Sequence, residues 1–511
     1  MWLSSIYLIF LLDLILSAKY NRICYFTNWG AHRSLKESRL YPEDIPPDLC
    51  THILYAFANL HGRSLQPQLT NDINVYQGEQ PLYPRIMKLK EKNPNLKILI
   101  SCGGWGKAGD FEPLVGSESS RESFSENVIT FCRQYGFDGI DLDWEFPSAE
   151  HRERFGLLTK TMHKMFKKEV KKSKKDRLLI SLAVAAGKYL IKQGYDVPVL
   201  CKNVDMINVM TYDLYGGWYN KIGHHSALFH RTGETGMDRE LNTNNSMYNW
   251  IEAGCSRERL NIGIPGYGRA FTADGRDPLK ALGQSGGGSG GVSSPYLGES
   301  GLLTYFEICK KELKEGFKRY WHQQHQIPIS FKDGTWIGYD DPDSVRNKCK
   351  YVKREGFGGA MVWTLDMDDF NGQFCRKSKQ NSVHKFPLIS AIKEEFEIDE
   401  ITTPISTLSI ETSTLSNETI LINDQFQILL DQMFLNASSS SSTSLKFDQY
   451  YLFLFNLLTS SYLIWSTITR NTYIKKKTKQ NLLRCSRERL NIGIPGYGRA
   501  FTADGRDPLK A

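Results

Sequence analysis

Residues 137–147 read FDGIDLDWEFP and place Asp138, Asp141, Asp143 and Glu145 within one short stretch. The last three occupy every second position, and apolar residues fill the positions between them. Because successive side chains of a β-strand point to opposite faces, this alternation predicts a strand with carboxylates on one face. A strand of a buried parallel sheet has no solvent side, so its acidic face is expected to line a functional cavity.

The rest of the chain predicts an α/β fold with a closed barrel. Short apolar or β-branched runs predict eight strands, at 22–26, 51–58, 97–101, 139–143, 178–184, 206–210, 261–265 and 359–363. Helical patterns separate several of these strands, for example at 120–136 and 341–356. Eight strands alternating with helices predict a (β/α)8 TIM barrel, and a doubly wound open sheet is the alternative.

The regular alternation stops between the seventh and eighth strands, over about residues 269–339. GQSGGGSGGVSSP predicts a flexible loop, and PISFKDGTWIGYD alternates like a β-hairpin around Asp333 and Gly334. We therefore expect a small α+β insertion domain that walls one side of a cleft at the barrel mouth.

The N-terminus and the cysteines indicate export. Residues 1–18 form an apolar run that ends in small residues, which predicts a secretory signal peptide, although Asp13 interrupts the run. The ten cysteines are then candidates for disulfides. Lys and Arg number 64 against 56 Asp and Glu, and no nucleic-acid-binding motif accompanies this mild excess.

The C-terminal part differs in character from the folded domain expected over residues 19–395. Residues 396–448 are Ser/Thr-rich and predict a linker. Residues 449–469 are uncharged and long enough to span a bilayer, so a membrane-anchored form is an open alternative. Residues 470–511 contain a basic stretch and a second copy of residues 255–281, which we interpret as an error of the gene model. Sequons at Asn244, Asn417 and Asn436 are candidate glycosylation sites.

Active sites of such barrels lie at the carboxyl ends of the strands, where this sequence gathers aromatic residues. These residues are Tyr25, Trp29, Phe57, Trp105, Trp218, Tyr267 and Trp363. Flat aromatic faces suit the apolar faces of sugar rings. The crowded carboxylates cannot all ionise cheaply, so one of them should keep a proton near neutral pH. A protonated carboxyl group is what cleavage of a glycosidic bond requires.

Several motifs make the chain resemble animal chitinases of glycoside hydrolase family 18. DGIDLDWE, at 138–145, is similar to the DxxDxDxE signature of that family, with every acidic position filled. CYFTNW, KILISCGGW, VMTYDLYGGW, GIPGYGRAF and GGAMVWTLDMDDFNG resemble further family motifs in the same order, over roughly residues 20–395. The resemblance implies a secreted endo-chitinase that hydrolyses β-1,4-linked N-acetylglucosamine polymers with retention.

The resemblance also implies roles for individual residues. Glu145 would protonate the glycosidic oxygen while the acetamido oxygen of the substrate attacks, assisted by Asp143, Asp141 and Tyr212. Together with the aromatic residues above, the expected substrate-binding set is Tyr25, Trp29, Phe57, Trp105, Met210, Asp213, Trp218, Tyr267, Arg269 and Trp363. Disulfides are implied between Cys24 and Cys50 and between Cys309 and Cys375. The cysteines left without an assignment are Cys102, Cys132, Cys201, Cys255 and Cys349.

The expected partner is chitin or a chito-oligosaccharide, bound by a monomer without metal, cofactor or nucleic acid. Two alternatives stay open, a catalytically silent chitin-binding lectin and an endo-N-acetylglucosaminidase that acts on N-glycans. Lectins of the family typically lack the last acid of the signature, which this chain keeps as Glu145.

Overall fold

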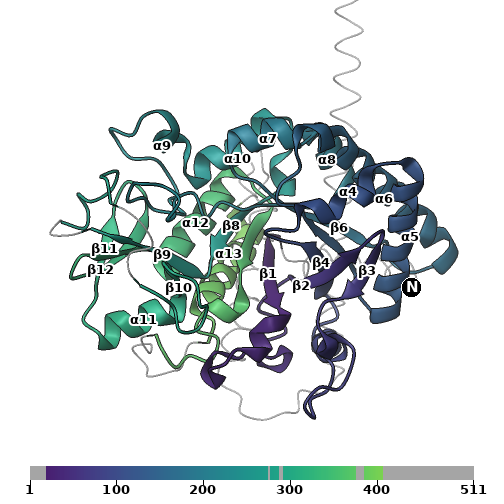
Figure 1. Cartoon of the computed structure of the whole chain (residues 1–511), viewed down its shortest axis with the longest axis horizontal. Helices are drawn as coiled ribbons and strands as arrows, with labels where there is room; N and C mark the ends of the chain where they lie inside the picture. The colour runs from purple at the N-terminus through teal and green to yellow at the C-terminus, as the bar shows by residue number, and fades with distance from the viewer. Residues whose placement is uncertain (1–18, 274–276, 287–291, 376–384, 407–511) are drawn as a thin grey trace, which may run out of the picture. The chain divides into compact units, whose positions relative to one another are not determined.

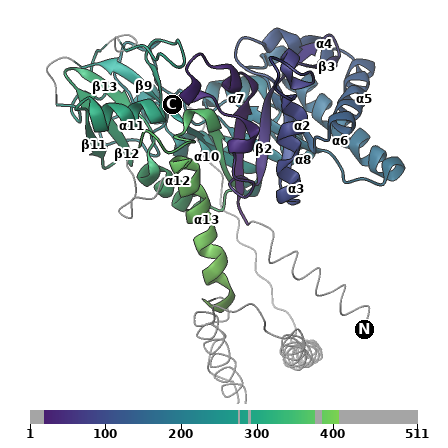
Figure 2. The same cartoon turned by 90° about the horizontal axis from the view of Figure 1, so that it is seen from below.

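The computed structural model describes residues 19–273, 277–286, 292–375 and 385–406, all within the unit Met1–Leu408. Figure 1 and Figure 2 show this part of the chain from two directions. Several predicted segments lie outside the described residues: the signal peptide, the linker beyond residue 406, the apolar run 449–469, the stretch 470–511, and the sequons at Asn417 and Asn436.

Eight parallel strands close into a barrel, which confirms the predicted (β/α)8 fold. They are β1 (Asn21–Thr27), β2 (His52–His61), β4 (Lys97–Gly103), β5 (Gly139–Asp143), β6 (Leu179–Val184), β7 (Met206–Val209), β8 (Leu260–Pro265) and β14 (Gly359–Trp363). Their hydrogen-bonded order is β1-β14-β8-β7-β6-β5-β4-β2, and a parallel pairing of β1 with β2 closes the ring. The short strand β3 (Ser64–Pro67) extends β2 as an antiparallel hairpin.

Helices cover the outside of the barrel, where Figure 1 shows α5 (Glu118–Tyr135) and α6 (Arg152–Ser173) beside the strands. Helix α5 begins where the Ser117 side chain accepts a hydrogen bond from the backbone N–H of Ser120. It ends at Gly136, whose φ of 84° is the left-handed conformation that favours glycine. Phe124 and Val128 on its apolar stripe are fully buried.

Strand β5 shows why the acidic stretch faces the barrel interior. Ile140 and Leu142 are buried in the same apolar cluster as the core residues of α5 and α6. The residues that alternate with them along the strand must therefore point the opposite way, into the barrel. These residues are Asp141 and Asp143, so the acidic face read from the sequence lies at the mouth of the barrel.

The insertion contains a five-stranded antiparallel sheet, ordered β10-β9-β13-β12-β11. Its elements are β9 (Tyr267–Thr272), β10 (Leu302–Thr304), helix α11 (Tyr305–Lys314), β11 (Lys318–His322), β12 (Ile327–Lys332) and β13 (Thr335–Gly338). Strands β12 and β13 form the predicted hairpin, and its turn residues Asp333 and Gly334 have φ angles of 46° and 82°. The expected insertion is confirmed, although its sheet is larger than one hairpin and begins at Tyr267.

The described part of the chain contains three disulfides: Cys24–Cys50, Cys201–Cys255 and Cys309–Cys375. The first and third are the pairs that the resemblance implies. The second, which the sequence left open, joins α8 (Val197–Asn203) to the segment after α10 (Thr243–Glu252). Cys102, Cys132 and Cys349 are buried and free.

The candidate glycosylation site Asn244 lies in the first turn of α10 and is half-buried. Its Oδ1 accepts a hydrogen bond from Tyr351 Oη at 3.1 Å, and Ser246 of the same sequon is buried. A glycan at Asn244 would have to displace this contact.

Helix α13 (Pro387–Ser406) continues to residue 406, although the Ser/Thr-rich sequence predicts a linker from residue 396. Its first turn is capped by Asp368, whose Oδ2 accepts backbone hydrogen bonds from Leu388 and Ile389 at 3.0 Å and 3.2 Å. Within the described ranges, none of the helices combines the length and the apolarity needed to cross a membrane.

Candidate active site

The innermost acid of the site is Asp141, which has no exposed surface. Its Oδ2 accepts hydrogen bonds from Tyr25 Oη and Ser101 Oγ, both at 2.7 Å, while its Oδ1 has no partner among the described residues. Burial raises the pKa of Asp141, and the hydroxyl groups of Ser101, Tyr25 and Ser181 oppose that rise. Asp141 is therefore a buried carboxyl group that two donors hold in a fixed orientation.

Asp143, two residues further along β5, is nearly as buried as Asp141. Its Oδ1 has no hydrogen-bond partner among the described residues. Burial, the nearby Glu145 and the nearby Asp141 together raise the pKa of Asp143 well above its ordinary value. An inward carboxyl group without a partner is available to a ligand that brings a hydrogen-bond donor.

The turn after β4 fixes the backbone of Asp143. Gly104 N–H donates to Asp143 O at 2.8 Å. Gly103 has a φ of 106°, and a Cβ at that position would lie 2.1 Å from Asp143 O. Only glycine permits this close approach, which accounts for Gly103 in the segment after the predicted third strand.

Glu145 lies just past the end of β5 and is half-buried. Burial, and to a smaller extent the negative charge of Asp213, raise its pKa to about 7. Glu145 therefore keeps its proton up to neutral pH, as the crowding of carboxylates in the sequence predicts for one member of the group.

Asp213 and Arg269 form an ion pair beside this acid. Arg269 Nε donates to Asp213 Oδ1 at 2.5 Å, and the guanidinium lies 4.7 Å from the ring centroid of Trp218. Burial alone would raise the pKa of Asp213, but contacts with His225 and Arg269 outweigh it and lower that pKa. Asp213 is therefore a persistent negative charge next to Glu145.

Aromatic rings gather around Trp363 at the end of β14. Its centroid lies 5.0 Å from that of Tyr25, 5.9 Å from that of Phe57 and 6.4 Å from that of Trp29. Tyr25 is buried, so it contributes through Asp141 and Trp363 rather than through an exposed face. Trp363 and Trp29 keep part of their surface exposed and can meet a sugar ring.

The remaining predicted residues divide into two groups. Met210 and Tyr212 pack in the same interior cluster as Trp363, and the Tyr267 ring lies 6.2 Å from that of Tyr212. Trp105 and Trp218 lie outside this cluster and are 82% and 58% exposed. The structure thus brings most predicted residues to one mouth and leaves two tryptophans at its rim.

Sequence reasoning missed two side chains of the site, Ser101 and His225. Ser101 lies in the predicted strand 97–101, where the two-residue period could have placed it on the inward face. His225 lies in a loop, and its Nδ1 is 3.6 Å from Asp213 Oδ1. No local pattern marks that residue.

The arrangement suits acid catalysis on a bond between sugar rings. It combines a proton donor that functions at neutral pH, a buried carboxyl group without a partner and a partly exposed aromatic floor. In the part of the chain that the structure describes, no group of three or more His, Cys, Asp or Glu side chains is placed to hold a metal ion.

Comparisons with known proteins agree with this geometry. The sequence pattern described as glycosyl hydrolases family 18 matches residues 21–368. Chitotriosidase-1 of Mus musculus is 36% identical over 387 residues, which are 74% of this chain and 79% of that protein. A probable endochitinase of Caenorhabditis elegans is 40% identical over 383 residues, 74% of this chain and 60% of that protein.

Among solved structures, human YKL-39 is 35% identical, with a TM-score of 0.68. The match covers 74% of this chain and all of that chain, at 100%. YKL-39 is described as a pseudo-chitinase with retained chitooligosaccharide binding properties. Likeness to relatives therefore does not by itself distinguish catalysis from binding.

Proposed function

Because the chain belongs to glycosyl hydrolase family 18, we propose that it is a secreted endo-chitinase. It cleaves β-1,4-linked N-acetylglucosamine polymers, and the products retain their anomeric configuration. The observation that carries the proposal is the pKa of Glu145, which burial and Asp213 raise to about 7. A carboxyl group that is protonated at neutral pH can act as the general acid for the leaving group.

In this mechanism Glu145 donates its proton to the glycosidic oxygen and later activates water. The acetamido oxygen of the bound sugar attacks the anomeric carbon, in the substrate-assisted variant of glycoside hydrolysis. Asp143, whose Oδ1 has no partner among the described residues, accepts a hydrogen bond from the acetamido N–H and offsets the positive charge that develops. Asp141 shares a proton with Asp143, and the Tyr212 hydroxyl orients the acetamido group.

Trp363 forms the floor beneath the sugar at the point of cleavage. Trp29 and Phe57 lie beside it, and Trp105 and Trp218 extend the binding surface at the rim. Tyr267 and Arg269 come from β9 of the insertion, and Asp213 pairs with Arg269. Met210 packs in the interior cluster with Trp363 and completes this binding set. This set of aromatic faces and hydrogen-bonding groups suits a chain of N-acetylglucosamine units.

The disulfides support an extracellular location. Cys24–Cys50, Cys201–Cys255 and Cys309–Cys375 would persist in an oxidising compartment, and an N-terminal signal peptide over 1–18 agrees with export. A form anchored in the membrane through residues 449–469 is the alternative.

A second candidate function is a chitin-binding lectin, which the similarity to YKL-39 favours. Such a lectin would bind the sugar chain without cleaving it. Glu145 favours the enzyme over the lectin, because its raised pKa keeps the carboxyl group protonated near neutral pH and so able to donate the proton that cleavage needs.

Turnover of chitotetraose by the wild-type protein and by Glu145→Gln decides among these functions. The enzyme should release shorter oligomers, and the variant should lose about a hundred- to ten-thousand-fold in kcat, the typical contribution of general acid catalysis. Binding without turnover by the wild type would establish the lectin. Cleavage of a high-mannose glycoprotein but not of chitotetraose would establish the endo-N-acetylglucosaminidase.

A further inference from the structure

His225 is a buried imidazole whose two ring nitrogens both lack a hydrogen bond within the described part of the chain. Its side chain is 0% exposed. Buried polar atoms in folded proteins are nearly always satisfied, so an exception calls for an explanation. His225 lies in the loop after β7, in the sequence GHHSA at 223–227.

One charged atom lies within reach of the ring. His225 Nδ1 faces Asp213 Oδ1 at 3.6 Å, and the ring packs 5.2 Å from that of Tyr267. Arg269 and Asp340 are the other charged groups that act on it. Burial lowers the pKa of His225, so the ring is neutral at neutral pH and has one N–H to donate.

The adjacent His224 differs in that both of its nitrogens have partners. Its Nε2 lies 3.0 Å from Pro328 O, and its Nδ1 accepts from the backbone N–H of Ser226 at 3.3 Å. The two rings are nearly parallel, with centroids 5.9 Å apart. The missing hydrogen bonds are therefore a property of His225 and not of the whole segment.

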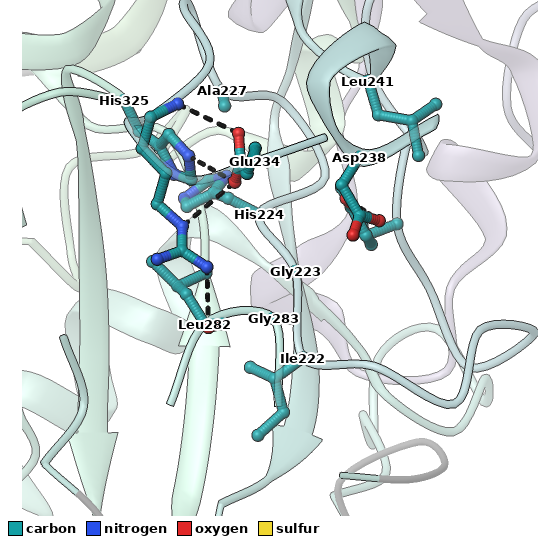
Figure 3. A pocket seen from close by; sticks show the side chains of 12 residues that line it. Ile222, Gly223, His224, Ala227, Glu234, Asp238, Leu241, Leu282, Gly283 and His325 are labelled. Atoms are coloured by element: carbon teal, nitrogen blue, oxygen red, sulfur yellow. Dashed lines mark hydrogen bonds and ion pairs between the residues drawn. The ribbon is translucent and has the colours of Figure 1, made fainter. Parts of the chain in front are cut away.

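His224 also forms one wall of the pocket drawn in Figure 3. Within that pocket Glu234 accepts from Arg231 Nε at 3.0 Å and lies 3.2 Å from His325 Nε2. These charged groups pair with one another, and His225 is not among the residues that line this pocket. The acceptor that the geometry offers to His225 is Asp213.

We propose that His225 is a positioning residue for Asp213, whose Oδ1 accepts a hydrogen bond from His225 Nδ1–H once a sugar chain fills the site. The inference rests on the proposed function, because Asp213 is the charge beside the acid Glu145. The present distance of 3.6 Å is just beyond a hydrogen bond, and such bonds at active sites often tighten only in the substrate complex. Arg269 and His225 would then hold the carboxylate from two sides.

A double-mutant cycle between the two residues tests this role. His225→Leu removes the donor, and kcat/KM for chitotetraose should fall about tenfold, as expected for a lost hydrogen bond to a charged group. His225→Asn keeps an N–H donor and should recover most of that loss. In an Asp213→Asn background, His225→Leu should lower kcat/KM by less than about twofold, because the effects of two residues that act through one contact are not additive. Equal losses in both backgrounds would overturn the proposal.

His322→Gln is the matched control, because the His322 ring packs against that of His325, with centroids 4.2 Å apart, and has no contact with Asp213 among the described interactions. This variant should leave kcat/KM within about twofold of the wild-type value, which is the limit set above for the loss in the Asp213→Asn background. A second measurement requires no change at His225. The pKa of His225, followed by NMR, should fall in Asp213→Asn, since Asp213 is a group that raises it. An unchanged value would also overturn the proposal.

The same cycle measured by binding separates this inference from the proposed function. The dissociation constant of chitotetraose is measured by tryptophan fluorescence in a Glu145→Gln background. Non-additivity between positions 213 and 225 should appear there as well. A wild-type protein that binds but does not cleave chitotetraose would refute the proposed enzymatic function. The double-mutant cycle measured by binding would still test the role of His225.

Discussion

Tyr25 Oη and Ser101 Oγ both donate to the same oxygen of Asp141, each at 2.7 Å. Asp141 is completely buried, and burial raises its pKa. The two hydroxyl groups stabilise the ionised form and limit that rise. The protonation of the Asp141–Asp143 pair therefore depends in part on the hydroxyl groups of Tyr25 and Ser101.

Tyr25→Phe should raise the pKa of Asp141, because it removes a donor that stabilises the ionised carboxylate. One hydrogen bond to a charged group contributes about 1.5 kcal/mol, which corresponds to about one pH unit. The acid limb of the kcat/KM profile, which reports the titration of the coupled aspartates, should move to higher pH by about that amount. Tyr83→Phe is the control, since the buried Tyr83 hydroxyl has no partner among the described residues. An acid limb that stays in place in Tyr25→Phe would contradict this reading.

The titration of Glu145 should determine the basic limb of the pH profile of kcat/KM. Catalysis needs its protonated form, so kcat/KM should decline above about pH 7. Asp213→Asn removes the negative charge that adds to the pKa of Glu145, so the basic limb should move to lower pH. The position of the limb is the readout, because the height of the profile also reflects lost substrate contacts. Asp238→Asn, which removes a carboxylate bound to Tyr215 and Lys221, should not move it.

Strand positions could be predicted because each strand carries its own local signal. The range 139–143 appears unchanged as β5, and 359–363 appears as β14. The second strand runs longer than its apolar core, to His61, because β3 pairs with its end. The sequence predicts a small α+β insertion but marks only one hairpin of its five-stranded sheet, since β9 and β10 come together from distant parts of the chain.

The site could be predicted where motif residues and strand ends coincide, as at Glu145 and Trp363. Contacts between loops could not be predicted from one sequence. Cys201 and Cys255 are 54 residues apart, and their pairing depends on how α8 and α10 pack. His225 approaches Asp213 because the loop after β7 folds back, and a histidine in a loop carries no periodic signal.

Trp105 allows a test of the rim surface in which a loss of binding cannot be explained by a loss of protein stability. Its side chain is 82% exposed, so Trp105→Ala should change the free energy of unfolding by less than about 0.5 kcal/mol. The dissociation constant for chitohexaose should nevertheless rise about three- to tenfold, which is the range for one lost aromatic contact. Trp105→Phe keeps a ring and should retain most of the affinity. Unchanged binding of chitohexaose by Trp105→Ala would remove this residue from the substrate surface.

The Cys201–Cys255 disulfide should contribute to stability and not to catalysis. Cys201 precedes β7 and Cys255 precedes β8, so the bridge lies toward the amino ends of strands whose carboxyl ends form the active site. Replacing both cysteines by serine frees a loop closed over 54 residues and should lower the free energy of unfolding by about 2–4 kcal/mol. Urea unfolding measures the loss, while kcat/KM at 25 °C should stay near the wild-type value. A variant that unfolds at the wild-type urea concentration but loses activity would show that the bridge shapes the mouth instead.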